Sequence, residues 1–348
     1  TEYPALEKRV GKDYYEASVL LDGCENDVRL LAQVLTDRVG VPPGTIQTLV
    51  GWPKGEGAEA HRPTRANIMA ALARLAKTVR EGDRVVVHVS GHGVQVPDED
   101  DAEESDGKDE ALLPADGDVG DDPKNPWQNA IRDDDWGDAL RKIRAAGAHV
   151  WLLMDCCHSG SSARGIADAG TKYRRLRRDA FGALERAPKR RGLGGTRPGP
   201  SAADDVEGIT AFYAAQSYQE VPELRVEGSK GKTAYGLLTY VVAQALQRSR
   251  PDTTFHDLYQ QAVGGYCALR KHKQAPPLAE GDLARTLGGA AAGSEPPLTL
   301  RRSGPRLVLD AGSLYGIAAG TELAVYAPGG RGQAESRLGA AVVDAVEV

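Results

Sequence analysis

Short, continuous apolar runs alternate with helix-like segments over the first 270 residues of the chain. The apolar runs, at residues 85–89, 150–154 and 209–215, have the length of buried strands. Apolar residues recur at helical spacing over residues 26–38, 64–80, 136–146, 236–248 and 255–270. Thr64 stands where it would cap the start of the second of these helices. Buried strands joined by helices predict an α/β fold, with a mostly parallel sheet and helices on both faces.

Two segments interrupt this alternation. Residues 98–122 are acidic and contain glycines, whereas residues 171–206 are first basic and then rich in Gly, Pro and Ser. The second segment is longer than an ordinary loop of a compact domain, so we expect a flexible, protease-accessible linker. From residue 297 onward, strand-like pieces separated by glycines indicate a small β-rich module. The chain is therefore predicted to comprise an α/β domain at 1–290 and a β module at 297–348.

Composition narrows the classes of function. The 348 residues carry 43 Lys and Arg against 49 Asp and Glu, and this net charge of −6 argues against a general nucleic-acid binder. No run approaches the roughly 18 apolar residues of a membrane span, and no signal peptide is recognisable at residue 1. The four cysteines form no C-x-x-C pair, which fits a reducing cytosol. We expect a cytoplasmic chain that binds neither nucleic acid nor membrane. Both ends look cut, so we also expect a longer parent protein and a truncated C-terminal module.

Reactive residues follow two of the predicted strands. One strand ends in Ser-Gly-His-Gly at residues 90–93, and the other in Asp-Cys-Cys-His-Ser-Gly at residues 155–160. Parallel α/β sheets carry their chemistry at the carboxyl ends of the strands. A thiol needs a nearby base, because the thiolate is the nucleophile. In extended chain Cys157 and His158 point to opposite faces, so His92 is the better partner for Cys157.

The backbone N–H groups of Gly93 and Cys157 are then suitably placed to form an oxyanion hole. Together, the two motifs resemble those of the caspase-like clan, and within it the metacaspases and their bacterial relatives, the orthocaspases. The resemblance covers roughly residues 1–290, and the Gln-Ala-Cys-x-Gly signature of true caspases is absent. It implies a caspase-hemoglobinase-type three-layer sandwich, with Cys157 as nucleophile, His92 as acid/base partner and no third triad member. It also implies that the family's first strand precedes residue 1 or is supplied otherwise.

The same resemblance implies an acidic primary specificity pocket. Its matching positions are Asp155 and Asp27, with Cys24 and Ser90 beside them. Two carboxylates in a shielded pocket favour a guanidinium and repel an Asp side chain. The implied activity is cleavage of protein or peptide substrates after Arg or Lys. Simpler explanations stay open, because Asp155 could cap a turn and Asp27 could be a first-turn helix charge.

The basic linker offers residues that such a pocket accepts. Within residues 171–206 we expect self-cleavage after one of four basic residues, Arg178, Lys189, Arg190 or Arg191. The alternative is that this linker binds an acidic partner or nucleic acid.

The resemblance implies Ca²⁺ as a possible activating metal ion, and it implies no required cofactor. Asp109, Asp133 and Asp134 match aspartates that bind Ca²⁺ in family members, and hard carboxylates suit this ion. Arg164 stands where a fourth carboxylate is expected. A bound, activating Ca²⁺ and a solvated acidic surface are both open readings of these aspartates.

Three rivals to an Arg/Lys-specific peptidase remain at this point. They are a catalytically silent caspase-like scaffold, a Ca²⁺-responsive regulatory module, and a cysteine peptidase of Asp or Asn specificity. The resemblance also implies a monomer, unlike the dimers of caspases.

Overall fold

A four-stranded sheet forms the centre of the computed structural model. Its strands lie in the order β1 (Arg84–Ser90), β7 (His149–Asp155), β8 (Ile209–Tyr213) and β11 (Leu278–Gly281). The first three are parallel and β11 is antiparallel, which confirms the mostly parallel sheet. The structure describes residues 2–51, 58–97, 108–122, 125–156, 172–174, 176, 181, 208–214, 221–228, 231–269, 277–288, 300–303, 306–309, 319–327 and 336–345.

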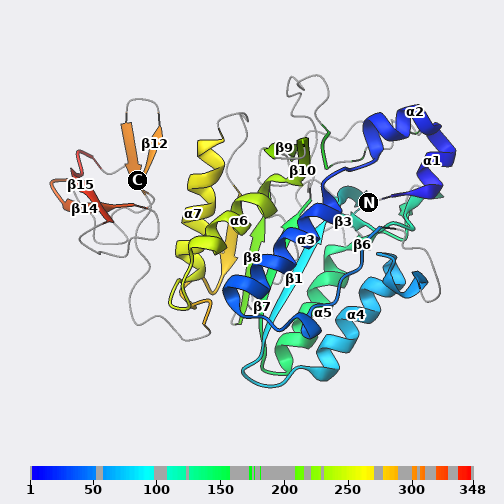
Figure 1. Ribbon diagram of the computed structural model, residues 1–348, viewed down its shortest axis with the longest axis horizontal. Helices are drawn as coiled ribbons and strands as arrows, with labels where there is room; N and C mark the ends of the chain where they lie inside the picture. Colours follow the sequence, from blue (N-terminus) through cyan, green and yellow to red (C-terminus); the bar gives the residue numbers. More distant parts are fainter. Residues whose placement is uncertain are drawn as a thin grey trace.

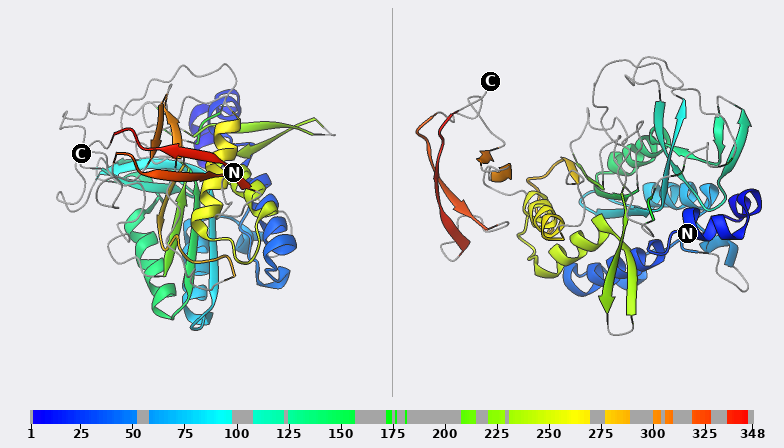
Figure 2. Two further views of the ribbon diagram at one scale, coloured as in Figure 1. Left: turned by 90° about the vertical axis from the view of Figure 1, so that its left-hand side faces the viewer. Right: turned by 90° about the horizontal axis from the view of Figure 1, so that it is seen from above.

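Helices cover both faces of this sheet, so the architecture is the three-layer α/β sandwich expected from the sequence (Figures 1 and 2). On one face lie α3 (Cys24–Val34), α6 (Leu237–Arg248) and α7 (Phe255–Ala268). On the other lie α4 (Arg65–Thr78) and α5 (Asp133–Ala145). The capping residue expected for α4 is in place, because Thr64 Oγ1 accepts the backbone N–H of Asn67 at 3.3 Å.

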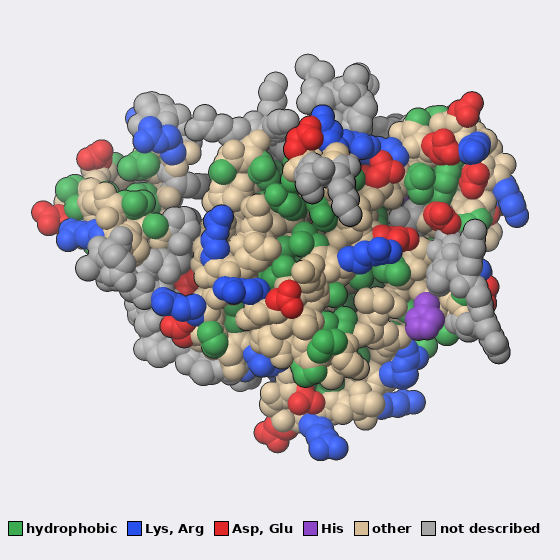
Figure 3. All heavy atoms as spheres, in the orientation of Figure 1, with side chains coloured by type: hydrophobic (Ala, Val, Ile, Leu, Met, Phe, Trp, Pro, Cys, Tyr) green, Lys and Arg blue, Asp and Glu red, His purple; other side chains and the backbone are tan. Residues whose placement is uncertain are grey.

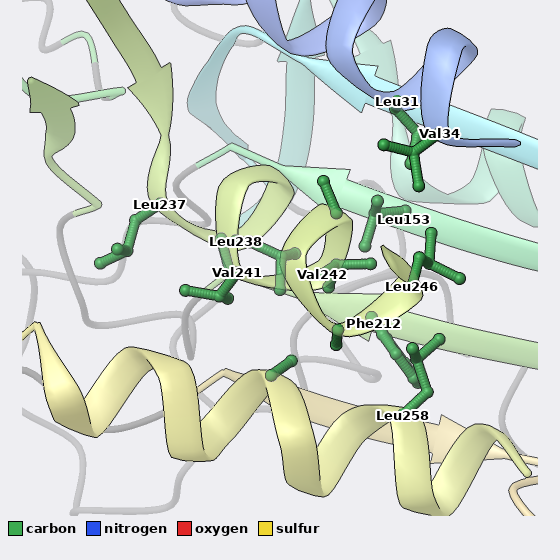
Figure 4. Close-up of a cluster of buried hydrophobic side chains, with 14 of the residues drawn as sticks. Leu31, Val34, Leu153, Phe212, Leu237, Leu238, Val241, Val242, Leu246 and Leu258 are labelled. Carbon is green, nitrogen blue, oxygen red and sulfur yellow. The ribbon is translucent and has the colours of Figure 1, made fainter. Parts of the chain in front are cut away.

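The alternation of side chains along β7 divides the core in two. Trp151 and Leu153 pack with α3, α6 and α7, whereas Val150 and Leu152 pack with α4 and α5. Successive strand residues point to opposite faces, so a continuous apolar run is what a strand covered on both sides requires. Figure 4 shows Leu153 within the first cluster, among side chains of α3, α6 and α7.

Smaller elements surround the carboxyl edge of the sheet. A three-stranded antiparallel sheet has the order β2-β3-β6, and β4–β5 and β9–β10 are two-stranded. The strands are β2 (His92–Pro97), β3 (Lys108–Leu113), β4 (Asp118–Asp122), β5 (Asn125–Gln128), β6 (Ile131–Arg132), β9 (Glu223–Gly228) and β10 (Gly231–Gly236). Besides α3 and α4, the helical elements before β1 are α1 (Pro4–Val10), α2 (Lys12–Tyr14), η1 (Tyr15–Val19), η2 (Leu35–Val39), η3 (Pro43–Thr45) and η4 (Ala58–His61). Hydrophobic patterning did not predict these strands, and β3 and β4 fall inside the acidic stretch that we treated as a break.

Two further hairpins follow near the C-terminus. They consist of β12 (Leu300–Ser303) with β13 (Arg306–Leu309), and β14 (Glu322–Tyr326) with β15 (Arg337–Val342). In Figure 1 they lie beyond α7, on the side of the molecule away from α1. Each of these strands pairs only within its own hairpin among the described residues. The division into residues 1–290 and 297–348 stays a prediction.

The outer edge of β1 borders a cavity. Among the described strands β1 pairs only with β7, and a cavity of about 510 Å³ lies along β1. Its lining comes from β1, from α3 and α4, and from the extended segment at residues 46–50. The expectation that a further strand of the parent protein, or one supplied otherwise, completes the sheet stays a prediction.

The surface carries both signs of charge. On the face in Figure 3, basic and acidic side chains are interspersed, in line with the near balance of 43 basic and 49 acidic residues. Within the described ranges, no helix is both long enough and apolar enough to span a membrane.

Candidate active site

The two sequence motifs meet at the carboxyl edge of the central sheet. Ser90, at the end of β1, is in register with Asp155, at the end of β7. The N–H of Gly91 donates to the Asp155 carbonyl oxygen at 3.4 Å. Cys156 follows Asp155 and is fully buried. Cys157, the expected nucleophile, comes next in sequence and lies outside the described residues.

His92 opens strand β2 and is fully buried. Its Nε2 lies 2.6 Å from the carbonyl oxygen of Val19, the last residue of η1. A carbonyl oxygen only accepts, so Nε2 carries the proton and Nδ1 keeps its lone pair. No hydrogen-bond partner of Nδ1 is found among the described residues. Burial lowers the pKa of His92 to about 3, so the imidazole is neutral near pH 7.

Tyr3 holds the backbone and the ring of His92. The Tyr3 hydroxyl accepts the His92 N–H at 3.4 Å and donates to the Leu113 carbonyl oxygen at 3.3 Å. The two rings lie 5.4 Å apart, centroid to centroid. The N–H of Tyr3 in turn donates to the Tyr15 hydroxyl at 2.6 Å. The imidazole is therefore oriented by a backbone carbonyl and a tyrosine, neither of which the sequence motifs revealed.

The predicted acidic pocket encloses an arginine of this same chain. Arg174 is fully buried, with Nη2 at 2.6 Å from Asp27 Oδ2 and Nη1 at 3.4 Å from Asp155 Oδ1. Nη1 also donates to Ser90 Oγ at 2.7 Å, and that hydroxyl donates to Asp27 Oδ2 at 2.7 Å. Three of the four residues that we assigned to the pocket thus contact one guanidinium. The fourth, Cys24, is buried at the start of α3, one turn before Asp27.

Both pocket carboxylates are fixed by donors behind them. Asp27 Oδ1 accepts the N–H of Gly236 at 2.8 Å. Asp155 Oδ2 accepts the N–H and the hydroxyl of Thr239, each at 2.7 Å, in the first turn of α6. The Thr239 hydroxyl lies 3.0 Å from His88 Nε2, and burial lowers the pKa of His88 to about 4. These bonds hold the carboxylates in place without a ligand, which is how a preorganised site reduces the cost of binding.

Glu223 is a third carboxylate that sequence reasoning missed. Its Oε1 lies 3.5 Å from Arg174 Nη2 and accepts the N–H of Gly23 at 2.7 Å. Its Oε2 accepts the N–H of Asp22 at 2.9 Å. Glu223 therefore ties the loop before α3 to the pocket. No motif marks it in the sequence, since it begins a strand that the hydrophobic pattern did not predict.

Burial and charge act against each other in this cluster. Burial raises the pKa of Asp27 to about 6, although the Arg174 guanidinium acts to lower it. Burial acts to lower the pKa of Arg174, but the nearby carboxylates, Asp155 foremost, raise it well above its usual value. Arg174 is therefore charged at every working pH. An uncharged side chain in its place would leave two buried carboxylates without their cation.

The backbone around Arg174 pairs as an extended strand. The Arg174 N–H donates to the Val221 carbonyl oxygen at 2.9 Å, and the Glu223 N–H donates to the Lys172 carbonyl oxygen at 2.8 Å. The Gly93 N–H donates to the Arg174 carbonyl oxygen at 3.1 Å. Gly93 is the residue that the sequence placed in the oxyanion hole. The Arg174 side chain thus lies in the pocket, while the Arg174 carbonyl oxygen is hydrogen-bonded to the expected oxyanion-hole donor, the Gly93 N–H.

The remaining predicted sites are less informative. Arg178, Lys189, Arg190 and Arg191 lie outside the described residues, as does Arg164.

The described residues do not assemble a Ca²⁺ site. Asp133 and Asp134 lie in the first turn of α5, where their negative charges interact favourably with the helix dipole. Asp109 is in β3, opposite Val96. No group of three or more His, Cys, Asp or Glu side chains in the described part of the chain is arranged to hold a metal. Ca²⁺ binding by Asp109, Asp133 and Asp134 stays a prediction, and no step of the chemistry below is routed through the ion.

A mostly parallel sheet with helices on both faces is the α/β arrangement of the caspase-hemoglobinase type. Sequence comparison narrows this class. Residues 9–164 match the metacaspase, peptidase C14 domain, so this part of the chain is similar to the peptidase domain of metacaspases, which belong to the caspase-like clan. Whether it is of the bacterial type stays a prediction.

Individual relatives show how far the similarity extends. Metacaspase III c of Phaeodactylum tricornutum is 36% identical over 142 residues, which cover 41% of this chain and 38% of that protein. Metacaspase-7 of Arabidopsis thaliana is 34% identical over 152 residues, covering 43% and 34%. The matched part spans about a third of the length of these relatives. Among solved structures, caspase-1 of Spodoptera frugiperda aligns over 78% of this chain and 84% of that one, at 13% identity and a TM-score of 0.41.

Proposed function

We propose that the chain is a cysteine endopeptidase that cleaves after Arg or Lys, with Cys157 as nucleophile and His92 as acid/base. The observation that carries this proposal is the pose of Arg174. Its guanidinium lies between Asp27 and Asp155, and its carbonyl oxygen accepts the Gly93 N–H at 3.1 Å. An arginine whose side chain and carbonyl are both held this way is in the position of a residue about to be cut.

The chemistry follows from the tautomer of His92. Nδ1 takes the Cys157 thiol proton, and the sulfur attacks the carbonyl carbon of the bound residue. The Gly93 N–H, together with the N–H of Cys157, would stabilise the oxyanion. The C–N bond then breaks while the imidazolium returns its proton to the leaving amine. Water, deprotonated by Nδ1, hydrolyses the thioester, and the released thiolate takes up the proton from the imidazolium, which frees the acid product and restores the thiol.

The charges of the pocket support the choice of substrate. Asp27 and Asp155 are fully buried and flank a single cation, and Glu223 adds a third negative charge at 3.5 Å. A substrate Asp or Glu would have to be buried beside these carboxylates, which costs several kcal/mol. Lys would keep the charge but lose the planar, two-nitrogen contact with Asp27, Asp155 and Ser90. We therefore expect Arg to be preferred over Lys.

The pose of Arg174 also supports self-processing, at the Arg174–Arg175 bond. This bond lies in the same basic linker as Arg178, Lys189, Arg190 and Arg191, which stay candidates for later cuts. Until the bond is cut, Arg174 occupies the primary pocket and excludes other substrates.

Hydrolysis of four fluorogenic peptides that differ only in a terminal Arg, Lys, Asp or Asn tests the activity. The purified chain is assayed with Ca²⁺ or a chelator, and Cys157→Ala is the blank. Cleavage after Arg and Lys alone, absent in the variant, is the expected result. Cleavage after Asp or Asn would refute the pocket assignment, and inactivity of the wild-type chain on all four would favour a silent scaffold.

Self-processing is tested separately by sequencing the fragments that wild-type chain produces on incubation. A new N-terminus at Arg175, absent from Cys157→Ala, is expected. A chain that cleaves peptides and yet stays intact would refute self-processing, because Arg174 must then leave the pocket without being cut.

A further inference from the structure

A second cation of the linker is bound two residues before Arg174. Lys172 Nζ lies 3.1 Å from Asp22 Oδ1 and donates to the Leu20 carbonyl oxygen at 2.8 Å. Only 13% of the Lys172 side chain is exposed. Two of the three N–H donors of the ammonium are thus used by groups of the loop before α3.

This loop is held in position independently of Lys172. The Asp22 N–H donates to Glu223 Oε2 at 2.9 Å, and the neighbouring Gly23 N–H donates to Glu223 Oε1 at 2.7 Å. The other carboxylate oxygen of Asp22, Oδ2, accepts from Arg225 Nη2 at 2.8 Å. Asp22 is therefore oriented by β9, and Oδ1 remains for a cation that arrives from the side of the linker.

Extended geometry sets the spacing between the two cations. Alternate residues of an extended strand point to the same face, so Lys172 and Arg174 share a face and Tyr173 points to the other. Glu223 connects the two positions, because it contacts the Arg174 guanidinium at 3.5 Å and holds the backbone of Asp22. The two cation positions are thus parts of one continuous acidic surface.

We propose that Asp22 and the Leu20 carbonyl form a second cation-binding subsite, which selects substrates with Lys or Arg two residues before the cleaved Arg. This proposal rests on the peptidase function proposed above and extends its substrate from a single basic residue to the pattern basic–any–Arg. A neutral Gln at that position keeps an N–H donor but lacks the charge. A Glu at that position would be repelled by the carboxylates of Asp22 and Glu223.

Three peptides and two variants test the subsite. The peptides are acetyl-Lys-Tyr-Arg, acetyl-Gln-Tyr-Arg and acetyl-Tyr-Lys-Arg, each with the same fluorogenic leaving group. The last has the composition of the first with its two cations adjacent. The variants are Asp22→Asn and, as a matched control, Asp37→Asn at an exposed aspartate of η2.

The wild-type chain and Asp37→Asn are expected to cleave Lys-Tyr-Arg with a kcat/KM about fivefold to tenfold above that of the other two peptides, mainly through KM. A charge-assisted hydrogen bond to a partly exposed carboxylate accounts for about that ratio. In Asp22→Asn the ratio is expected to fall to about one or two. Equal rates in wild type, or a preference that survives Asp22→Asn, would overturn the subsite.

Calorimetric binding of acetyl-Lys-Tyr-Arg-amide and acetyl-Gln-Tyr-Arg-amide separates the two proposals. The chain used is Cys157→Ala/Lys172→Gln/Arg174→Met, in which the linker's own cations no longer fill the pocket and the subsite. Tighter binding of the Lys peptide, lost when Asp22→Asn is added to this chain, supports the subsite even if no peptide is cleaved. Cleavage of Arg peptides without such a difference refutes the subsite and leaves the peptidase function standing.

Discussion

Replacing Arg174 by Met is expected to destabilise the chain strongly at neutral pH. The change is made in the Cys157→Ala background, so that self-processing does not interfere. Asp27 and Asp155, each with no exposed side-chain surface, then lose the cation that sits between them. Removing one partner of a buried ion pair costs about 3–5 kcal/mol, because the remaining charge stays buried.

The loss is expected to depend on pH through Asp27. Its folded pKa, about 6, exceeds the ordinary value of 3.8, because burial raises it. The folded state therefore binds this proton more tightly than the unfolded state, and stability falls as pH rises between these two values, by roughly 3 kcal/mol at 1.36 kcal/mol per unit. Arg174 acts to lower the pKa of Asp27, so this pKa is higher in the variant, and the stability of the variant keeps decreasing above pH 6. The difference between variant and parent is then smallest near pH 5 and largest near pH 8.

Urea denaturation followed by tryptophan fluorescence at these two pH values measures the difference. The matched control is Arg29→Met, which removes a surface pair with Glu25 whose arginine side chain is 74% exposed. Such a pair contributes less than about 1 kcal/mol. Acetyl-Tyr-Arg-amide at a hundred times its Kd should restore about 2.7 kcal/mol to Arg174→Met, because it supplies the missing guanidinium. Equal losses in the two variants at pH 8, or a loss that does not shrink at pH 5, would refute the reasoning.

Three further expectations concern activity. In Gly236→Ala the added Cβ would overlap Asp155 Oδ2 and lie 2.6 Å from Arg174 Cζ, so KM for Arg peptides should rise at least about tenfold. In the control Gly265→Ala the added Cβ has no neighbour closer than 3.6 Å, so KM should be unchanged. Equal KM values in the two variants would contradict the pocket geometry. His92→Ala should lower kcat by about 10²–10⁴ with the fold intact by circular dichroism, and wild-type turnover in this variant would remove His92 from the mechanism. As pH falls, kcat/KM for Arg peptides should decline through KM, because protonated Asp27 no longer attracts the guanidinium; since Arg174 has left the pocket of the active enzyme, this decline should begin above pH 6. His92, with a pKa of about 3, should not contribute, and a decline carried by kcat would point to another group.

Local patterning predicted the central elements well. The apolar runs at 85–89 and 150–154 became β1 and β7, and the helices were found within a few residues of their expected bounds. This success has a physical basis, because a strand covered on both faces must be apolar at every position. Strands β2, β3 and β9 were missed since they are short, mixed in polarity and stabilised by neighbours distant in sequence.

By itself, the sequence determined the α/β class, the resemblance to metacaspases and the two motifs that end β1 and β7, because each of these depends on residues that are contiguous in the chain. Tertiary structure decided which of many basic linker residues enters the acidic pocket. Arg174 and Asp27 are 147 residues apart, and only the paired backbone of residues 172–174 brings them within 2.6 Å. The same holds for Glu223 and for the Val19 carbonyl that orients His92. A buried polar group takes its role from the partners that surround it, and those partners are chosen by the fold.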